Sequence, residues 1–283
     1  MRKTAFFWMV MASIFLLALS DLANGQKLRL EISLSKETYL TSEPIWLDLT
    51  LTNVSSDTVR IFGPCVHCGD TRFQVINQKA DTLPYVGIEA VVAYGPGQLM
   101  DLGEKKFNCF NVIEYYGEKG GLFRIAMSRF KLKPDSYSIR AIYGGSREGG
   151  VISPALNFEV EEPTGAELQA LNLLEKGYDT ELSSTPEVAL ECYKDLVHKF
   201  PKSVYVEAAY NELASTDSLK VEMLRKFPDS GFSKRLIQVV TNHKKPAEQT
   251  RFLHRIIKDH PGTRSAKFAE KELKIITKKE GLK

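Results

Sequence analysis

Apolar and polar residues alternate along the first half of the chain with a period of two. In the segment LRLEISLS, residues 28–35, leucine or isoleucine occupies every second position and charged or hydroxyl-bearing residues stand between them. Successive side chains of a β-strand point to opposite faces, so this pattern predicts a strand with one buried face. The same reading, with turn signals such as Gly95-Pro96-Gly97 between segments, predicts strands at residues 45–52, 58–62, 72–77, 88–93, 122–130, 136–143 and 155–160. Short strands without intervening helices favour an antiparallel sandwich.

The hydrophobic period changes to three and four near Thr164. Leu168, Leu171 and Leu174 fall on one side of a helix, which we expect to stop at Gly177, and Thr164 followed by Glu167 has the spacing of a capping box. The preceding Glu-Glu-Pro, residues 161–163, has the composition of a linker. We therefore predict a β domain at residues 26–162 and an α-helical domain at residues 163–283.

Three similar segments punctuate the helical half: LVHKFPKS, EMLRKFPDS and RIIKDHPGT. Each contains a proline that breaks one helix and, two positions later, a serine or threonine able to cap the next helix. These pairs are Pro201 with Ser203, Pro228 with Ser230, and Pro261 with Thr263. Breaks that recur about every 30 residues predict stacked helical hairpins, which bury their apolar stripes against their neighbours.

The first 25 residues have the pattern of a secretory signal. Arg2 and Lys3 precede an apolar run at residues 5–19, and Ala23-Asn24-Gly25 fits a cleavage site. The run is shorter than the roughly 20 residues that a transmembrane helix needs. We expect cleavage after Gly25, no transmembrane segment in the mature chain, and a secreted, periplasmic or cell-surface location. Export places the cysteines in an oxidising compartment.

The charge of the chain is small overall and uneven along its length. A formal net charge of +3 argues against nucleic acid as a partner. Acidic residues dominate residues 161–219, and basic residues dominate residues 220–283. We interpret these charges as solvated helix faces, and a basic docking face for an acidic partner or a membrane surface is the alternative.

Both halves carry a family resemblance. YLTSEPI leading into LTLTN, residues 39–53, and LKPDSY leading into IRA, residues 132–141, resemble the opening and closing strands of bacterial immunoglobulin-like domains. The helical half is similar to secreted bacterial tetratricopeptide-repeat (TPR) proteins, because Gly177, Ala189 and Tyr193 precede Pro201 at that family's small, small and aromatic positions. The first resemblance implies packing or recognition, and the second implies a concave surface that binds a protein or peptide. The expected fold is multidomain, an antiparallel immunoglobulin-like β-sandwich followed by stacked antiparallel TPR-like hairpins.

Catalytic motifs are missing from the sequence. There is no His-Glu-x-x-His, no Gly-x-Ser-x-Gly and no phosphate-binding loop. We therefore expect no catalytic residue, no metal ligand and no cofactor. Six aromatic residues could stack on a sugar, although packing explains them more simply. They are Tyr85, Tyr94, Phe107, Phe110, Tyr115 and Tyr116.

The segment GPCVHCGD, residues 63–70, holds the remaining candidate chemistry. A redox Cys-x-x-Cys begins a helix, whereas a strand is predicted after Cys68. A zinc site needs four ligands, and this domain offers only Cys65, Cys68, Cys109 and His67. We predict a structural disulfide, either Cys65 with Cys68 or one of these two with Cys109. Cys192 fits a core position.

These observations favour an exported, non-enzymatic binding or assembly scaffold with a protein or peptide partner. The first alternative is a carbohydrate-binding module that uses the aromatic residues of the sandwich. The second is thiol-disulfide exchange at Cys65 and Cys68.

Overall fold

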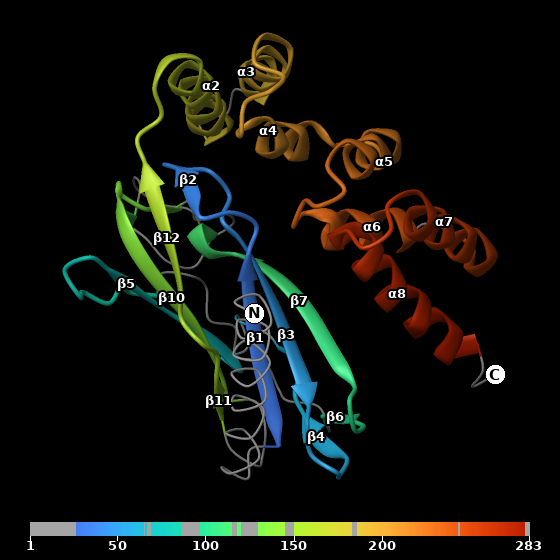
Figure 1. The fold of residues 1–283 in the computed structure, drawn as a ribbon. Helices are drawn as coiled ribbons and strands as arrows, with labels where there is room; N and C mark the ends of the chain where they lie inside the picture. The colour runs from blue at the N-terminus through green and yellow to red at the C-terminus, as the bar shows by residue number, and fades with distance from the viewer. Residues whose placement is uncertain are drawn as a thin grey trace, which may run out of the picture.

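The chain folds into a β region followed by a helical region (Figure 1). The computed structural model describes residues 27–64, 66, 69–85, 97–114, 118–119, 130–144, 150–182, 186–242 and 244–280. The predicted signal, the predicted strand at residues 88–93, nearly all of the one at 122–130, and both Cys65 and Cys68 lie outside these residues. Strand β12 ends at Glu161 and helix α2 begins at Gly165, so the change of period near Thr164 coincides with the change of structure.

Two antiparallel sheets make up most of the β region. The first has the order β1 (Leu28–Leu34), β3 (Trp46–Asn53), β7 (Lys105–Asn111). In the second, β10 (Asp135–Tyr143) pairs along one edge with β5 (Thr71–Asn77) and along the other with β11 (Val151–Ile152) and β12 (Leu156–Glu161). Strand β2 (Thr38–Leu40) joins β12 in parallel. Two small pairs, β4 (Val59–Ile61) with β6 (Gln98–Met100) and β8 (Glu118–Lys119) with β9 (Phe130–Lys131), and a 3-10 turn, η1 (Val112–Glu114), complete the described part.

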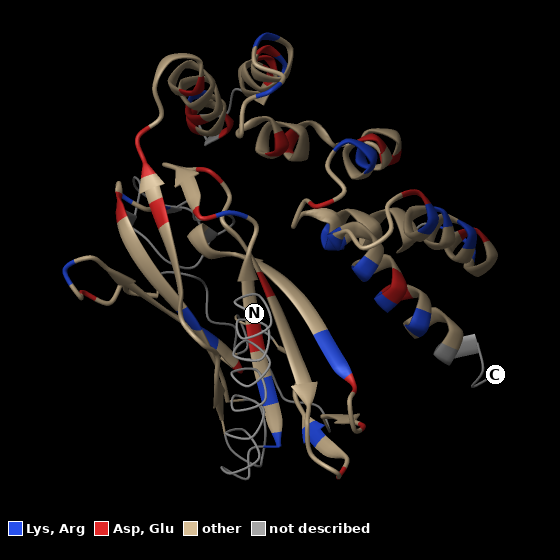
Figure 2. Cartoon of the chain, in the orientation of Figure 1, with Lys and Arg blue, Asp and Glu red and all other residues tan. Residues whose placement is uncertain are grey.

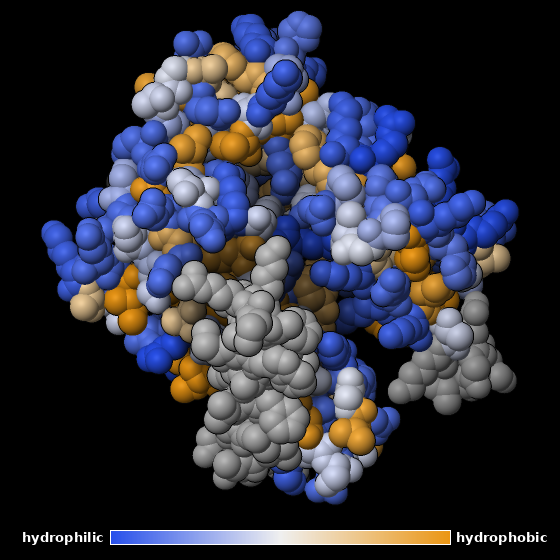
Figure 3. Space-filling model, viewed as in Figure 1, coloured by the Kyte–Doolittle hydropathy of each residue, from blue (hydrophilic) through white to orange (hydrophobic). Residues whose placement is uncertain are grey.

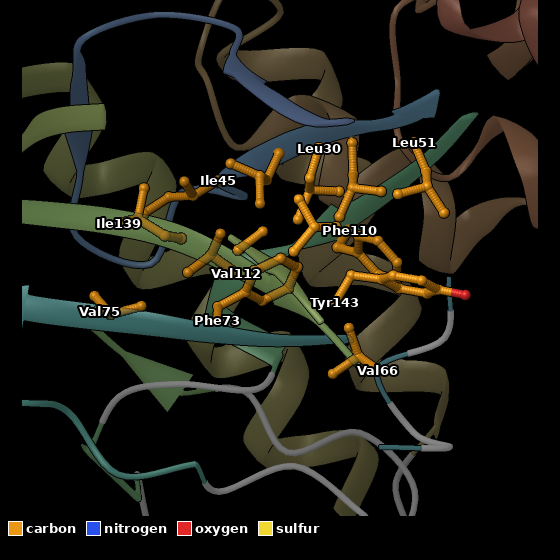
Figure 4. Close-up of a cluster of buried hydrophobic side chains, with 14 of the residues drawn as sticks. Leu30, Ile45, Leu51, Val66, Phe73, Val75, Phe110, Val112, Ile139 and Tyr143 are labelled. Atoms are coloured by element: carbon orange, nitrogen blue, oxygen red, sulfur yellow. The ribbon is translucent and has the colours of Figure 1, made fainter. Parts of the chain in front are cut away.

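The two sheets share one hydrophobic core (Figure 4). Leu47, Leu49 and Leu51 of β3 are fully buried in it, at alternate positions, and Ile139 and Tyr143 of β10 meet them from the second sheet. The alternation that predicted β3 is therefore the alternation of its core face. Its other face, which carries Trp46 and Asp48, contacts helices in place of solvent.

Strand β7 was not predicted. Asn108 and Phe110 are buried toward the β core, whereas Phe107 and Cys109 pack among helical residues. Because both faces are covered, its sequence KKFNCFN has no simple alternation of apolar and polar residues.

Within the described residues, seven helices follow the sheets; α2 and α3 lie beyond the end of β12, and the later helices run along the side of β7 (Figure 1). Their bounds are α2 (Gly165–Leu182), α3 (Pro186–Lys199), α4 (Val206–Leu213), α5 (Asp217–Lys226), α6 (Ser233–Asn242), α7 (Pro246–Asp259) and α8 (Arg264–Glu280). One buried cluster joins α2, α3 and α4, and a second joins α5 to α8 with Phe107 and Cys109 of β7. Acidic residues are conspicuous on the early helices and basic residues on α6 to α8 (Figure 2).

The three predicted helix breaks are confirmed. Helices α3, α5 and α7 end within two residues before Pro201, Pro228 and Pro261. The Ser203 and Ser230 hydroxyls accept backbone N–H groups two residues later. Each of these serines also donates to a glutamate of an earlier helix, Ser203 to Glu167 at 2.7 Å and Ser230 to Glu207 at 2.8 Å, so the two units repeat one arrangement.

Two local predictions about α2 were wrong. The helix does not stop at Gly177, which lies inside it beneath the Tyr193 ring; a Cβ atom on Gly177 would lie 2.4 Å from that ring. The capping box is also not formed as predicted, since the Glu167 carboxylate accepts from Ser203 of the following unit. Tertiary contacts took precedence over the local pattern at both positions.

Candidate binding cleft between the sheet and the helices

Trp46 connects the first sheet to the helices. It begins β3, and its indole N–H donates to Oε1 of Glu207 on α4 at 3.0 Å. Its ring stands edge-on to Phe232, with centroids 4.9 Å apart, and covers Gly231. A Cβ atom at Gly231 would lie 2.0 Å from the indole ring, so only glycine permits this close approach.

Arg264 makes a second connection from the first residue of α8. Its Nε lies 2.6 Å from Oδ1 of Asp48 on β3, and its Nη1 donates to the carbonyl of Asp229 at 2.6 Å. The backbone N–H of Arg264 donates to the Asp229 carboxylate. Because Arg264 is only 6% exposed, these partners hold the guanidinium in one position.

Tyr205 makes a third connection. Its hydroxyl donates to the Thr41 carbonyl at 2.7 Å, which fixes the start of α4 to the segment between β2 and β3. Burial raises the pKa of the Tyr205 hydroxyl, so it remains a donor at neutral pH.

The connections made by Trp46 and Arg264 border a cavity of about 410 Å³, which we call the junction cleft. The β region contributes Lys36, Glu43, Pro44 and Trp46 to its walls. The helical region contributes Glu207, Phe227, Asp229 and Arg264, among others. In the space-filling view, hydrophilic side chains gather in the recess where the two regions meet (Figure 3). The cleft is therefore a composite of segments that are far apart in the chain.

Glu43 is a buried carboxylate of the cleft with a full set of partners. It is 7% exposed, accepts the backbone N–H of Leu40 at 2.9 Å, and pairs with the Lys36 ammonium at 2.6 Å. Burial raises the pKa of this carboxyl, and the hydrogen bonds from Lys36 and Leu40 offset only part of the rise.

Glu207 is the second carboxylate of the cleft, and one of its two oxygens accepts hydrogen bonds. Its Oε1 accepts both the Trp46 indole and the Ser230 hydroxyl, whereas its Oε2 accepts no hydrogen bond from the described residues. Glu207 is partly buried, and this burial raises the pKa of its carboxyl. The bonds from Ser230 and Trp46 and the nearby charge of Arg264 act in the opposite direction.

Of the three candidate cysteines for a disulfide, the structure describes Cys109 and leaves Cys65 and Cys68 outside the described residues. Cys109 is a free thiol on β7, packed among helical residues, and burial raises its pKa. It therefore forms no disulfide with Cys65 or Cys68, and the alternative that used Cys109 is not realised in the structure. A bridge between Cys65 and Cys68 stays a prediction, since both lie outside the described residues. Cys192 is free and buried in α3, as expected.

The aromatic candidates that the structure describes are used in packing. Phe107 contacts Phe268 with ring centroids 5.3 Å apart, and Phe110 contacts Phe73 at 5.4 Å. Tyr85 packs against the β core. Tyr94, Tyr115 and Tyr116 lie outside the described residues.

The sequence reading missed Trp46, Glu43, Glu207 and Arg264, which define the cleft. Their partners are distant in sequence, since 161 positions separate Trp46 from Glu207 and 216 separate Asp48 from Arg264. Two local signals were available: a tryptophan at the start of a strand, and a glycine directly after the Pro-Asp-Ser of residues 228–230.

Over the residues that the structure describes, no three His, Cys, Asp or Glu side chains are grouped as metal ligands. No described helix combines the length and apolar character needed to cross a membrane.

Comparison with known proteins identifies no family. No family model matches the chain, and no curated protein matches it in sequence. Among solved structures, similarity extends to the sporulation control protein Spo0M from Bacillus subtilis, at 10% identity and a TM-score of 0.27, over 53% of this chain and 55% of that one. A mutant β-glucosidase from Listeria innocua in complex with laminaribiose is similar at 15% identity and a TM-score of 0.25, over 49% of this chain and 16% of that one. At these TM-scores neither likeness supports a functional argument.

Proposed function

We propose that this chain is an exported, non-enzymatic binding protein whose junction cleft receives a segment of a protein or peptide partner. The observation that carries the proposal is the composite cleft, in which charged side chains from two regions of the chain border one cavity. In this proposal the β region is an immunoglobulin-like sandwich and the helices form TPR-like hairpins. Two facing sheets and the repeated Pro-x-Ser breaks support that assignment.

The charged side chains of the cleft are held in place by partners within the chain, which suits them to ligand recognition. Lys36 and Glu43 pair with each other, and Arg264 is fixed by Asp48 and by the Asp229 carbonyl. Groups with fixed partners can present charge to a ligand at no further cost in side-chain entropy. A nucleophile or general base would need a free reactive atom next to a second catalytic group, and the proposal assigns no residue to that role.

The extracytoplasmic location in this proposal rests on the signal pattern of residues 1–25. Fractionation of cells that produce the full chain tests it. The processed protein is expected outside the cytoplasm, with Gln26 as its first residue. Retention of the unprocessed chain in the cytoplasm would contradict this part of the proposal.

Site-specific photo-cross-linking tests the binding role. A photoreactive phenylalanine analogue replaces Lys36 or Lys226, exposed residues of the cleft walls, or Arg72, an exposed residue of β5 that serves as the control. We expect one partner to cross-link at the two cleft positions and not at residue 72. That partner is then purified and its affinity for the unmodified chain is measured by calorimetry.

Two results would contradict the binding role. One is cross-linking of the same proteins at residue 72 and at the cleft. The other is an unchanged affinity of the purified partner after the cleft is blocked by a bulky adduct at residue 36.

A further inference from the structure

Three cations, Lys36, Lys226 and Arg264, and three carboxylates, Glu43, Glu207 and Asp229, line the junction cleft, but two of these carboxylates have no cation of their own among the described residues. Three carboxylates, those of Asp48, Asp229 and Glu207, act on the single guanidinium of Arg264. The two lysines of the cleft are engaged elsewhere, since Lys36 pairs with Glu43 and Lys226 binds Tyr210 and Glu222. Asp48 alone is enough to neutralise Arg264, so Glu207 and Asp229 leave an acidic excess in the cleft.

Glu207 is the partly buried carboxylate of this excess. It forms no ion pair with Arg264 or with any other described cation, and its Oε2 has no hydrogen-bond donor among the described residues. A partly buried carboxylate without a cation is less favourable than an exposed one, and a cation that reaches it relieves part of this cost. The second carboxylate, Asp229, is exposed at the cleft and uses one oxygen to accept the Arg264 N–H.

The walls between these charges are apolar. Pro44, Trp46, Val204, Phe227 and Pro228 contribute to them. Such a surface suits the methylene stem of a lysine or arginine side chain, which packs against apolar groups while its charged end is directed to an acceptor. The Nη2 of Arg264, which makes no hydrogen bond within the described part of the chain, is a donor for a main-chain carbonyl of the same ligand.

We infer that the junction cleft binds a lysine or arginine side chain of the partner segment, with its cationic end against Glu207 and Asp229. This inference rests on the proposed binding function and names the chemistry that its partner presents.

Trp46 provides a direct readout. The chain has two tryptophans, and the other, Trp8, lies in the predicted signal, so Trp46 is the only indole expected in the exported protein. Its N–H donates to the same Glu207 that is proposed to receive the cation. The indole signal in a ¹H–¹⁵N spectrum therefore reports directly on binding at this carboxylate.

The probes are Nα-acetyl-lysine N-methylamide, the arginine analogue, and Nα-acetyl-norleucine N-methylamide, which keeps the apolar stem and lacks the charge. A saturable shift of the Trp46 indole signal is expected with the two cationic probes, with at least tenfold weaker binding of the norleucine probe. No saturable shift with either cationic probe, or equal binding of norleucine, would overturn the inference.

Matched variants locate the site. Glu207→Gln removes the charge and keeps an acceptor for Trp46, and we expect at least tenfold weaker binding of the lysine probe. Glu270→Gln makes the same change on an exposed residue of α8 and is expected to bind as wild type. If Glu207→Gln does not fold, the affinity of Asp229→Asn for the lysine probe is the test, and we expect it to be weaker than that of wild type. Asp229 is exposed, and asparagine can still accept the Arg264 N–H. Wild-type affinity in the deciding variant would overturn the inference.

The two proposals fail separately. Probe binding without a cross-linked partner would contradict the proposed partner and support the cation-binding site. A cross-linked partner whose affinity is unchanged by Glu207→Gln or Asp229→Asn would support the binding function and contradict the inference that its ligand is a lysine or arginine side chain.

Discussion

The guanidinium of Arg264, at the start of α8, lies 2.6 Å from the carboxylate of Asp48 on β3. The two side chains are 7% and 18% exposed, so this ion pair is largely buried. It fixes the last helix of the chain against the first sheet, next to the hydrogen bond between Trp46 and Glu207. The helical region is therefore packed on the β region through specific polar contacts, and the junction cleft owes its shape to them.

Arg264→Met tests the importance of this ion pair. The change leaves the Asp48 carboxylate without its cation, and we expect the free energy of unfolding to fall by about 3 kcal/mol. Urea denaturation followed by circular dichroism measures this loss. The double variant Arg264→Met with Asp48→Leu should recover most of it, because neither buried charge remains. A loss below about 1 kcal/mol in the single variant would mean that the pair is not a main contact between the regions.

Gly231→Ala tests the close approach of Trp46. The added methyl group would lie 2.0 Å from the indole ring, so Trp46 or the segment before α6 must move. We expect a loss of about 1–3 kcal/mol and a red shift of Trp46 fluorescence as the ring gains contact with water. Gly63→Ala is the matched control, since a Cβ atom there meets no atom within 4 Å and the backbone has no positive φ. Equal effects of the two substitutions would rule out a specific contact with Trp46.

The strands that the sequence predicted well are those with one face in the common core. For β1 and β3, alternate leucines and isoleucines placed the strands within one residue of their observed bounds. The same pattern could not reveal β7, because Phe107 and Cys109 on its outer face pack against helices. Helices also cover the outer face of β3, but Asp48 on that face is polar and the alternation is kept; on β7 the covered outer face carries Phe107 and Cys109, and the alternation is lost.

The helix breaks could be predicted because proline acts locally, whereas the cleft could not. Pro201, Pro228 and Pro261 each end a helix by lacking a backbone donor, whatever surrounds them. Glu207, by contrast, looks like a solvated residue of an amphipathic helix until Trp46 covers it. The site depends on how the two regions pack together, and hydrophobic periodicity within either region carries no information on that packing.

The raised pKa of Glu207 predicts a pH-dependent stability. A carboxyl whose pKa is higher in the folded than in the unfolded state favours folding at acidic pH, and this contribution is lost as the pH rises through the folded pKa. Glu207→Gln removes the titration, so the variant should be more stable than wild type at neutral pH, and this advantage should shrink as the pH falls through the raised folded pKa toward the ordinary glutamate pKa of about 4.3. Thermal unfolding between pH 4 and pH 8 measures the difference. A constant difference across this range would contradict the assignment to Glu207.

Thiol counting separates the disulfide alternatives. The chain has four cysteines, and in the structure Cys109 is free and partly buried and Cys192 is free and buried. Without reductant, iodoacetamide is expected to label neither residue quickly in the native protein, because Cys192 is buried and the pKa of the Cys109 thiol is raised. After unfolding it should label both, and Cys65 and Cys68 should react only after reduction. Mass spectrometry of the alkylated peptides reads the result, and labelling of all four cysteines without reductant would refute the predicted bridge.

Lys271→Met tests an unfavourable charge between α8 and β7. The Lys271 ammonium reaches only the Phe107 carbonyl at 3.5 Å, and burial, with the nearby charge of Lys234, lowers its pKa. A lysine whose pKa is lower in the folded than in the unfolded protein opposes folding while it is protonated in both. Removal of its charge should therefore raise stability at neutral pH by up to about 1 kcal/mol. The gain should diminish as the pH rises through the lowered folded pKa toward the ordinary lysine pKa of about 10.4, because the folded protein then releases the proton and the penalty disappears. Lys258→Met, at an exposed position of α7, is the control and should change little. Thermal unfolding at pH 7 and pH 10 distinguishes these outcomes, and a destabilised Lys271→Met protein would show that the ammonium contributes favourable contacts to the interface.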